Sequence, residues 1–413
     1  MLAGLVGIFI AIVAIILLTW KGWKLEWSMF TGALIVGIFS GLGPVEGLII
    51  LGNSLRDPVT VYLILVIIAI TSFGNLLLKT GYLEGMIENL GKIIKDFRLL
   101  LGIIPALVGL LMVPGGAVFS APMIEGMGKE VEMDKDVVAS VNVVFRHLFY
   151  LIFPLYPPLL LIAEVSNIDI YSLIVFNLPV LILGLAVNSF YFFSKHSNNT
   201  RTSATEKMSA RLGRELFTSL FPFIMVLVLG IIFDVYFPLA LLAGILFVVV
   251  AGYPGREGKY SFRERAAQVI PGINWSMALA IVGIMVFKDF VQASGALDDL
   301  SVMLLEFGMP LLLLAILFPF VTGIITANHS AAIGIAISIF LHLLPQGNAG
   351  VAYMGIIFIS SLAGYVASPF HLCLIFTVEH FKANLLQVLI KVSIACSFLV
   401  ALGLVQFIIY TLS

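Results

Sequence analysis

The chain has 413 residues, of which 61% are hydrophobic and 11% are charged, and its formal net charge is −1. Soluble domains carry about 25% charged residues, so this composition excludes an ordinary soluble domain and indicates a polytopic protein of the lipid bilayer. The near-neutral charge gives no reason to expect a nucleic-acid partner. The two cysteines, Cys373 and Cys396, lie in apolar runs, which argues against a disulfide scaffold or a zinc cluster.

Runs of about 17–25 apolar residues predict membrane-spanning helices. Runs of this kind lie near 2–19, 27–51, 59–79, 137–163, 171–194, 215–233, 236–253, 272–292, 350–378 and 385–410, which predicts about ten transmembrane helices in an all-α polytopic membrane protein. The first run lacks a basic leader and a small-residue cleavage site, so we expect a retained span rather than a signal peptide.

Two further apolar stretches, 100–125 and 310–341, are interrupted at their centres. The interrupting residues are Pro114, Gly115 and Gly116 in the first stretch, and Asn328, His329 and Ser330 in the second. Most of the resulting halves are too short to cross a hydrocarbon core of about 30 Å. Each stretch is therefore expected to form a re-entrant hairpin.

The sequence repeats itself at an offset of about 214 residues. SFGNLLLKTGYLEG (72–85) aligns with VFKDFVQASGALDD (286–299), and HLFYLIFPLYPPLLLIAEV (147–165) aligns with LAGYVASPFHLCLIFTVEH (362–380). The two interrupted stretches align at nearly the same offset, so four elements recur in the same order. We therefore expect a first repeat over 1–194, a cytoplasmic linker over 195–214 and a second repeat over 215–413.

The distribution of Lys and Arg predicts the orientation of these repeats, because cytoplasmic loops are enriched in both residues. When the basic linker is placed in the cytoplasm and the spans alternate from there, Arg56 and Lys288 are the only basic residues in outer loops. Both termini then lie outside, and the two repeats have opposite orientations. Inverted repeats with broken helices at the midplane are a hallmark of secondary transporters.

Two predicted spans, 137–163 and 350–378, contain prolines near their centres, and Pro154 of the first matches Pro369 of the second. Proline removes a helical hydrogen bond and clashes with the preceding turn. In lipid, unwound backbone survives where it is buried or lines a wet cavity. Both spans are therefore expected to unwind near the membrane midplane, where they would meet the hairpin tips.

The polar side chains in these interrupted elements are the candidate substrate ligands. Arg146 is the most informative, because a cationic side chain at membrane depth is costly and usually functional, although it could instead snorkel or pair with a carboxylate or with backbone carbonyls. Histidine titrates near neutral pH, so His329 or His371 could carry a coupling proton. The candidate site comprises Pro114, Gly115, Gly116, Ser120, Arg146, His147, Asn328, His329, Ser330, Ser368 and His371. A carboxylate-rich cation site is not visible, so a sodium ion would take backbone carbonyls and hydroxyls.

Three blocks of the sequence resemble the signatures of one family. They are GGAVFSAPMI (115–124), FRHLFYLIFPLYPP (145–158) and AGYVASPFHLCL (363–374). They are similar to blocks of an uncharacterised family of archaeal and bacterial integral membrane proteins in the ion-transporter superfamily, beside divalent anion/sodium symporters, gluconate permeases and the arsenite pump's membrane subunit. The resemblance implies a scaffold, a transport domain that moves as an elevator, and a homodimer. The symporters carry Ser-Asn-Thr at both tips, which this chain lacks, so the coupling ion and dicarboxylate specificity stay open.

These observations predict a secondary active transporter of a small organic anion of the carboxylate type, working by symport or antiport with H⁺ or Na⁺ and without another cofactor. It would reside in the cytoplasmic (inner) membrane of a prokaryote. A passive anion channel and the membrane subunit of a pump are alternatives, and the chain has no ATP-binding loop of its own. An intramembrane enzyme is a weaker alternative, because the sequence has neither a His-Glu-x-x-His motif nor paired aspartates within its spans.

Overall fold

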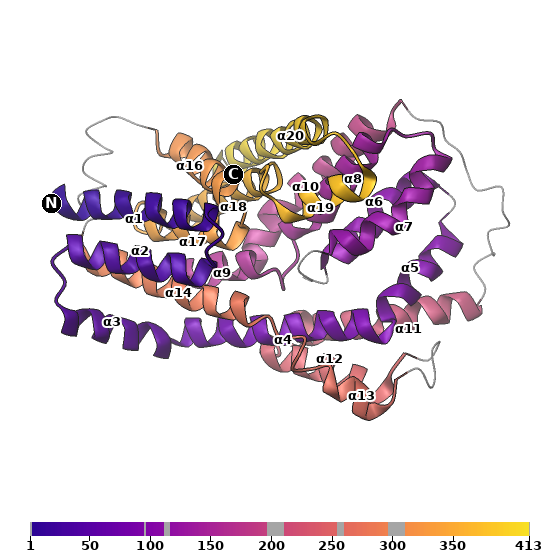
Figure 1. The fold of residues 1–413 in the computed structure, drawn as a ribbon, viewed down its shortest axis with the longest axis horizontal. Helices are drawn as coiled ribbons and strands as arrows, with labels where there is room; N and C mark the ends of the chain where they lie inside the picture. The colour runs from indigo at the N-terminus through magenta and orange to yellow at the C-terminus, as the bar shows by residue number, and fades with distance from the viewer. Residues whose placement is uncertain are drawn as a thin grey trace.

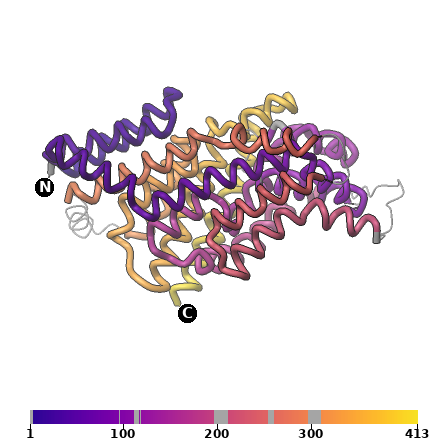
Figure 2. Tube along the Cα trace, turned by 90° about the horizontal axis from the view of Figure 1, so that it is seen from below, coloured from indigo at the N-terminus to yellow at the C-terminus, as the bar shows by residue number. Residues whose placement is uncertain are grey.

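The computed structural model of this protein describes residues 2–94, 96–110, 116–195, 210–253, 260–295 and 310–412. The fold is all-helical, with 83% helix and no strand among the described residues. Most of the long helices run roughly along the long axis of the molecule, as the two perpendicular views show (Figures 1 and 2). The all-α part of the predicted fold class is therefore confirmed.

The helices follow one another as two series. The first series consists of α1 (Leu2–Trp20), α2 (Leu25–Phe39), α3 (Pro44–Arg56), α4 (Pro58–Thr80), α5 (Tyr82–Ile93), α6 (Phe97–Leu110), α7 (Ala117–Glu130), α8 (Lys135–Leu148), the 3-10 helix η1 (Phe149–Leu151), α9 (Pro157–Ser166) and α10 (Ile170–Phe193). The second consists of α11 (Ala210–Leu227), the π-helix η2 (Val228–Ile232), α12 (Phe237–Ala251), α13 (Phe262–Ala267), α14 (Trp275–Ala293), α16 (Leu311–Thr326), α17 (His329–Phe340), α18 (Asn348–Val366), α19 (Leu372–Phe381) and α20 (Leu385–Leu412).

Six helices in the described part of the chain are long and apolar enough to cross a membrane. They are Pro58–Thr80, Ile170–Phe193, Arg211–Ile232, Trp275–Ala293, Asn348–Val366 and Leu385–Leu412. Large apolar side chains lie on the outer surface, among them Ile38 and Phe190, which are each 75% exposed. Extensive exposed apolar surface marks a membrane or partner contact, so these helices indicate a membrane protein.

The expectation of about ten spanning helices exceeds these six, because the other predicted spans are shorter or interrupted apolar helices. The span 27–51 is wrong as a single helix. Its chain leaves the helical path at Ser40 and resumes at Pro44, with Gly41 at a φ of 73°. Glycine tolerates this left-handed backbone and proline suits the first position of a helix. The sequence did not reveal this turn, because the apolar residues on both sides keep the mean hydropathy of the stretch high.

The helix ends follow from local capping. Asp57 precedes α4 and its carboxylate accepts a hydrogen bond of 2.9 Å from the N–H of Thr60, while Pro58 occupies the first helical position. Gly81, with a φ of 92°, ends the same helix in the left-handed conformation that favours glycine. The side chain of Asn274 caps α14 as that of Asp57 caps α4, by accepting a hydrogen bond of 3.1 Å from the N–H of Met277.

The helices pack in two groups; in Figure 1 most of the first lies in the lower part of the molecule and most of the second in the upper part, with α1 beside α17. The first helix group contains α1–α5 and α11–α14, and the second contains α6–α10 and α16–α20. The groups meet chiefly where α14 packs against α17, α4 against α9, and α1 against α16. Helices α9, α16 and α17 of the second group therefore lie against α4, α1 and α14 of the first.

Two helices of the second group are interrupted near Pro154 and Pro369, the prolines from which the interruptions were predicted. Residues 152–156 separate η1 from α9, and residues 367–371 separate α18 from α19. The second interrupted stretch of the sequence forms the pair α16–α17, which turns at Ala327 and Asn328. The first forms the pair α6–α7, and its tip residues 111–115 lie outside the described residues.

Candidate functional site

A cavity of about 450 Å³ lies at the interface between the two helix groups. The interrupted helices and the turn of α16–α17 form one wall, and helices α2 and α14 form the other. The lining residues are Leu25, Arg146, Tyr150, Tyr156, Pro158, Asn274, Ser276, Met277, Ala280, Ala327, Asn328, His329, Ser330, Tyr365, His371, Leu372 and Cys373. Small-molecule sites occupy clefts of about 300–1,000 Å³, so the cavity has room for a small solute.

Arg146 is the dominant charge at this cavity. Its side chain is among the largest fully buried ones in the described chain, with 1% of the residue exposed. Its Nε and Nη1 atoms have no hydrogen-bond partner among the described residues, and no described carboxylate forms an ion pair with it. A buried charge without a counter-charge costs about 3–5 kcal/mol, so this guanidinium calls for an anion or water in the cavity.

Two glycines determine where the Arg146 side chain lies. Gly116, at the N-terminus of α7, approaches so closely that a Cβ atom there would collide with Nη2 and lie 3.0 Å from Cζ. Gly109 of α6 brings backbone against the carbonyl of Arg146, so α6 and α8 pack without an intervening side chain. The hairpin α6–α7 therefore contacts the backbone of Arg146 through Gly109 and its guanidinium through Gly116.

Helix N-termini add positive potential to the same cavity. Asn328 to Ser330 begin α17 and Leu372 and Cys373 begin α19, and these residues line the cavity wall. The first N–H groups of a helix lack intrahelical acceptors, and they carry about half a positive charge. The Asn328 side chain satisfies one of them by accepting from Ala331 at 3.1 Å. Exposed N–H groups and one guanidinium together favour an anion.

His329 is held by hydrogen bonds on both ring nitrogens. Its Nδ1 lies 2.9 Å from the Tyr156 hydroxyl, and its Nε2 lies 2.9 Å from the Ser361 hydroxyl. Ser361 in turn donates to the carbonyl of Phe358 at 2.9 Å, so it accepts from Nε2–H. In a neutral ring, Nδ1 then accepts from the Tyr156 hydroxyl. His329 therefore connects the start of α17 to the unwound segment before α9 and to α18.

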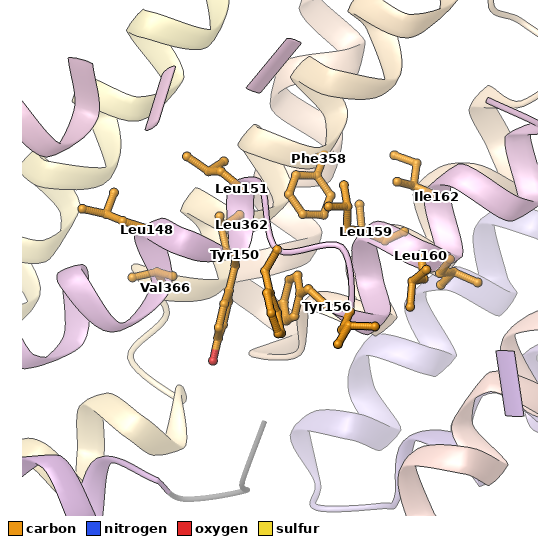
Figure 3. Packing of buried hydrophobic residues seen from close by; sticks show 14 of the residues in the cluster. Leu148, Tyr150, Leu151, Tyr156, Leu159, Leu160, Ile162, Phe358, Leu362 and Val366 are labelled. Atoms are coloured by element: carbon orange, nitrogen blue, oxygen red, sulfur yellow. The ribbon is translucent and has the colours of Figure 1, made fainter. Parts of the chain in front are cut away.

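Aromatic rings line the unwound segments. Tyr150 and Tyr156 stack with ring centroids 4.1 Å apart on the same side of the break between η1 and α9 (Figure 3). Tyr365 lies 4.2 Å from the ring of His371, which in turn lies 4.8 Å from the ring of His147. The unwound backbone is thus covered by rings whose hydroxyl and nitrogen atoms lie at the cavity.

The predicted site residues divide into four sets. Arg146, Asn328, His329, Ser330 and His371 line the cavity, while Gly116 and His147 contact residues that line it. Ser120 and Ser368 are buried away from the lining, and Ser368 donates to the carbonyl of Ile324 at 2.6 Å, which ties the second break to α16. Pro114 and Gly115 lie outside the described residues.

The structure also places residues at the cavity that the sequence analysis did not single out. Four of them are Tyr150, Tyr365, Tyr156 and Cys373. Tyr150 aligns with Tyr365 between the two repeats, which was a signal in the sequence, and Tyr156 and Cys373 lie in the same aligned blocks. Behind the lining lies Glu26, a carboxylate that is 2% exposed and accepts from the cavity-lining Ser276, whose Oγ is 3.1 Å from either carboxylate oxygen. Glu26 immediately precedes the predicted span 27–51, so it lay outside the predicted spans.

The fold and the cavity together define an all-helical membrane protein with a buried, positively charged cavity between two helix groups. A comparison with protein-family models matches residues 1–410 to DUF401, described as a protein of unknown function. The match covers nearly the whole chain, so the protein belongs to the DUF401 family. A comparison with curated proteins finds no match.

Proposed function

We propose that this protein is a secondary active transporter of a small organic anion, built from two inverted repeats. The observation that carries the proposal is the buried Arg146 guanidinium, which lines the 450 Å³ cavity without a counter-charge among the described residues. A carboxylate would supply the missing charge and accept two parallel N–H···O bonds from the planar guanidinium. The N–H groups at the starts of α17 and α19 would bind its remaining oxygens.

The pairing of helices supports the repeat architecture. An offset of about 214 relates α6 to α16, α7 to α17, α8 to α18 and α9 to α19. Helix α6 packs on α8 as α16 packs on α18, and α7 packs on α19 as α17 packs on α9. In the first helix group, α2 packs on α14 as α12 packs on α4. Each hairpin therefore contacts the distal half of the other repeat's interrupted helix.

Close contacts between helix backbones also support the repeat architecture, at the level of single residues. A Cβ atom on Gly109 would collide with the carbonyl oxygen of Arg146, and one on Gly323 would lie 2.5 Å from the carbonyl oxygen of Ser361. Gly109 and Gly323 are repeat partners, and so are Arg146 and Ser361. The same glycine-to-carbonyl contact thus recurs in both halves.

The location of the cavity supports alternating access. One wall belongs to the first helix group and the other to the second, so a movement of the second group relative to the first would carry the bound solute. This corresponds to a scaffold and a moving transport domain. The proposal includes a homodimer in a prokaryotic cytoplasmic membrane with both termini outside.

Glu26 is the candidate coupling group within this proposal. It is a buried carboxylate whose hydrogen-bond partner among the described residues is the Ser276 hydroxyl on the cavity wall. Its hydrogen bond to a cavity-lining hydroxyl places a group that can carry a proton beside the proposed anion. His329 is less suited to this role because both its nitrogens are engaged.

Purified protein in detergent should be screened for thermal stabilisation by small mono- and dicarboxylates, with and without Na⁺. Proteoliposomes preloaded with a stabilising anion should then show counterflow of the labelled anion, which a carrier supports and a passive channel does not. Stabilisation without counterflow would favour the channel or pump-subunit alternative. Absence of stabilisation by any anion would contradict the anion site itself.

A further inference from the structure

A second group of side chains beside Arg146 has the composition of a metal site. One ligand atom each from His147, His371 and Cys373 lies within 4.8 Å of the other two, and all three residues are buried. They come from two distant segments: His147 lies at the end of α8, and His371 and Cys373 lie at the start of α19. We propose that these residues bind a thiophilic metal ion, Zn²⁺ or Cu⁺, at the wall of the cavity.

The hydrogen bonds of the two histidines leave the necessary nitrogens free. His147 Nδ1 donates to the carbonyl of Val143 at 2.6 Å, while its Nε2 has no partner among the described residues. Metal-binding histidines usually donate their second nitrogen to such an acceptor, which fixes the ring orientation. Neither nitrogen of His371 makes a well-formed hydrogen bond with a described residue, although its ring lies close to the carbonyl of Val366. Nε2 of His147 and at least one nitrogen of His371 are therefore buried without a good partner, which a bound ion would explain.

The geometry requires a modest closing of the ligands. Ligand atoms around a tetrahedral zinc ion are about 3.5 Å apart, given metal–ligand distances of about 2.0–2.3 Å. The three ligand atoms here lie within 4.8 Å of one another, so side-chain shifts of about 1 Å would bring them to that spacing. His371 and Cys373 line the cavity, so a fourth coordination position would open into it. Three protein ligands with one open position is the arrangement of a zinc ion that binds an exchangeable ligand.

The charges are consistent with a thiolate ligand. Cysteine binds metal as the thiolate, whose negative charge would lie at the cavity that Arg146 also lines. With Cu⁺ the metal–thiolate unit is neutral, and with Zn²⁺ it keeps one positive charge, which an anion at the open position would balance. Thiolate and imidazole ligands suit both ions and disfavour Mg²⁺ and Ca²⁺.

Metal binding can be measured without any organic anion, so its outcome is separate from that of the transport proposal. Chelator-treated protein should bind one Zn²⁺ per chain in equilibrium dialysis, or one Cu⁺ in a chelator competition. Co²⁺ in place of Zn²⁺ should give tetrahedral d–d bands and a thiolate-to-metal charge-transfer band. Cys373→Ser should weaken binding by more than the 10–100-fold that loss of an outer-shell partner costs, and His371→Gln should do likewise.

Matched variants make the test decisive. Cys396→Ser removes a buried cysteine of α20 and His342→Ala an exposed histidine, and both should bind metal as the wild type does. Unchanged binding in Cys373→Ser, at an unchanged melting temperature, would overturn the proposal. If that variant does not fold, a Co²⁺ spectrum of the wild type without a thiolate band would overturn it equally.

Discussion

Tyr156 and His329 join the two halves of the chain at the cavity: the Tyr156 hydroxyl lies 2.9 Å from Nδ1 of His329, and both side chains are buried. Tyr156 ends the unwound segment before α9, and His329 begins α17. The bond therefore links the break of one half to the hairpin of the other. Its position makes the orientation of His329 dependent on residues far away in the sequence.

Replacement of Tyr156 by Phe should loosen this link. It leaves Nδ1 of His329 without its donor, and the loss should lower the free energy of unfolding by about 0.5–2 kcal/mol. Tyr353→Phe is the matched control, since no hydrogen bond of its hydroxyl is found among the described residues. Thermal unfolding in detergent measures both variants, and equal melting temperatures for the two would contradict the link.

Replacement of Arg146 by Gln should weaken anion binding about ten- to a hundredfold, because a hydrogen bond to a charged group contributes about 1.5–3 kcal/mol. Arg146→Lys should restore part of the affinity, since an ammonium lacks the planar fork. Lys391→Gln, which removes the half-buried cation of α20 away from the cavity, should leave affinity unchanged. A lowered melting temperature with unchanged affinity in Arg146→Gln would instead assign the residue a structural role.

Gly116→Ala should weaken anion binding through the same side chain. The φ of Gly116 is −55°, so alanine fits the backbone, but its Cβ would push the Arg146 guanidinium out of place. Gly126→Ala on the same helix meets no atom within 4 Å and should only raise helix stability, by up to about 1 kcal/mol. Titration of both variants with the anion compares them directly. Wild-type affinity in Gly116→Ala would show that the position of this hairpin end does not control the site.

Glu26→Gln should uncouple transport from the cation gradient. Glutamine keeps an acceptor for the Ser276 hydroxyl but cannot take up a proton. Counterflow of labelled anion should therefore persist, while accumulation driven by a pH gradient is lost. Glu379→Gln, an exposed carboxylate at the end of α19, serves as the control. Retained accumulation in Glu26→Gln would move the coupling role to another group.

Helix α11 should separate the two faces of the membrane. In a background without Cys373 and Cys396, Lys195→Cys should react with an impermeant thiol reagent from the cytoplasmic side, and Asp234→Cys from outside. Both positions are exposed and flank α11 and η2. Whole cells and inverted vesicles provide the two sides. Labelling of both positions from one side would contradict the inverted orientation of the repeats.

Much of the architecture follows from local properties of the chain. Apolar runs, prolines and glycines predicted helices, the breaks at Pro154 and Pro369, and the turn at Asn328, because these depend on hydropathy and on backbone geometry near each residue. The same reasoning failed at 27–51, where a glycine–proline turn is embedded in an apolar run. It also overlooked Glu26, which becomes buried through packing of α2 against α14.

The sequence by itself determined that the protein is helical and apolar, and that Arg146 is an exceptional residue for a membrane helix. Only the tertiary structure decided that Arg146 has no counter-charge in the described chain, that His329 is engaged on both nitrogens, and that His147, His371 and Cys373 lie together. The physical reason is that charge pairing, hydrogen bonding and metal ligation depend on distances between side chains. Those distances are set by which helices pack together, and residues more than 200 positions apart meet at this cavity.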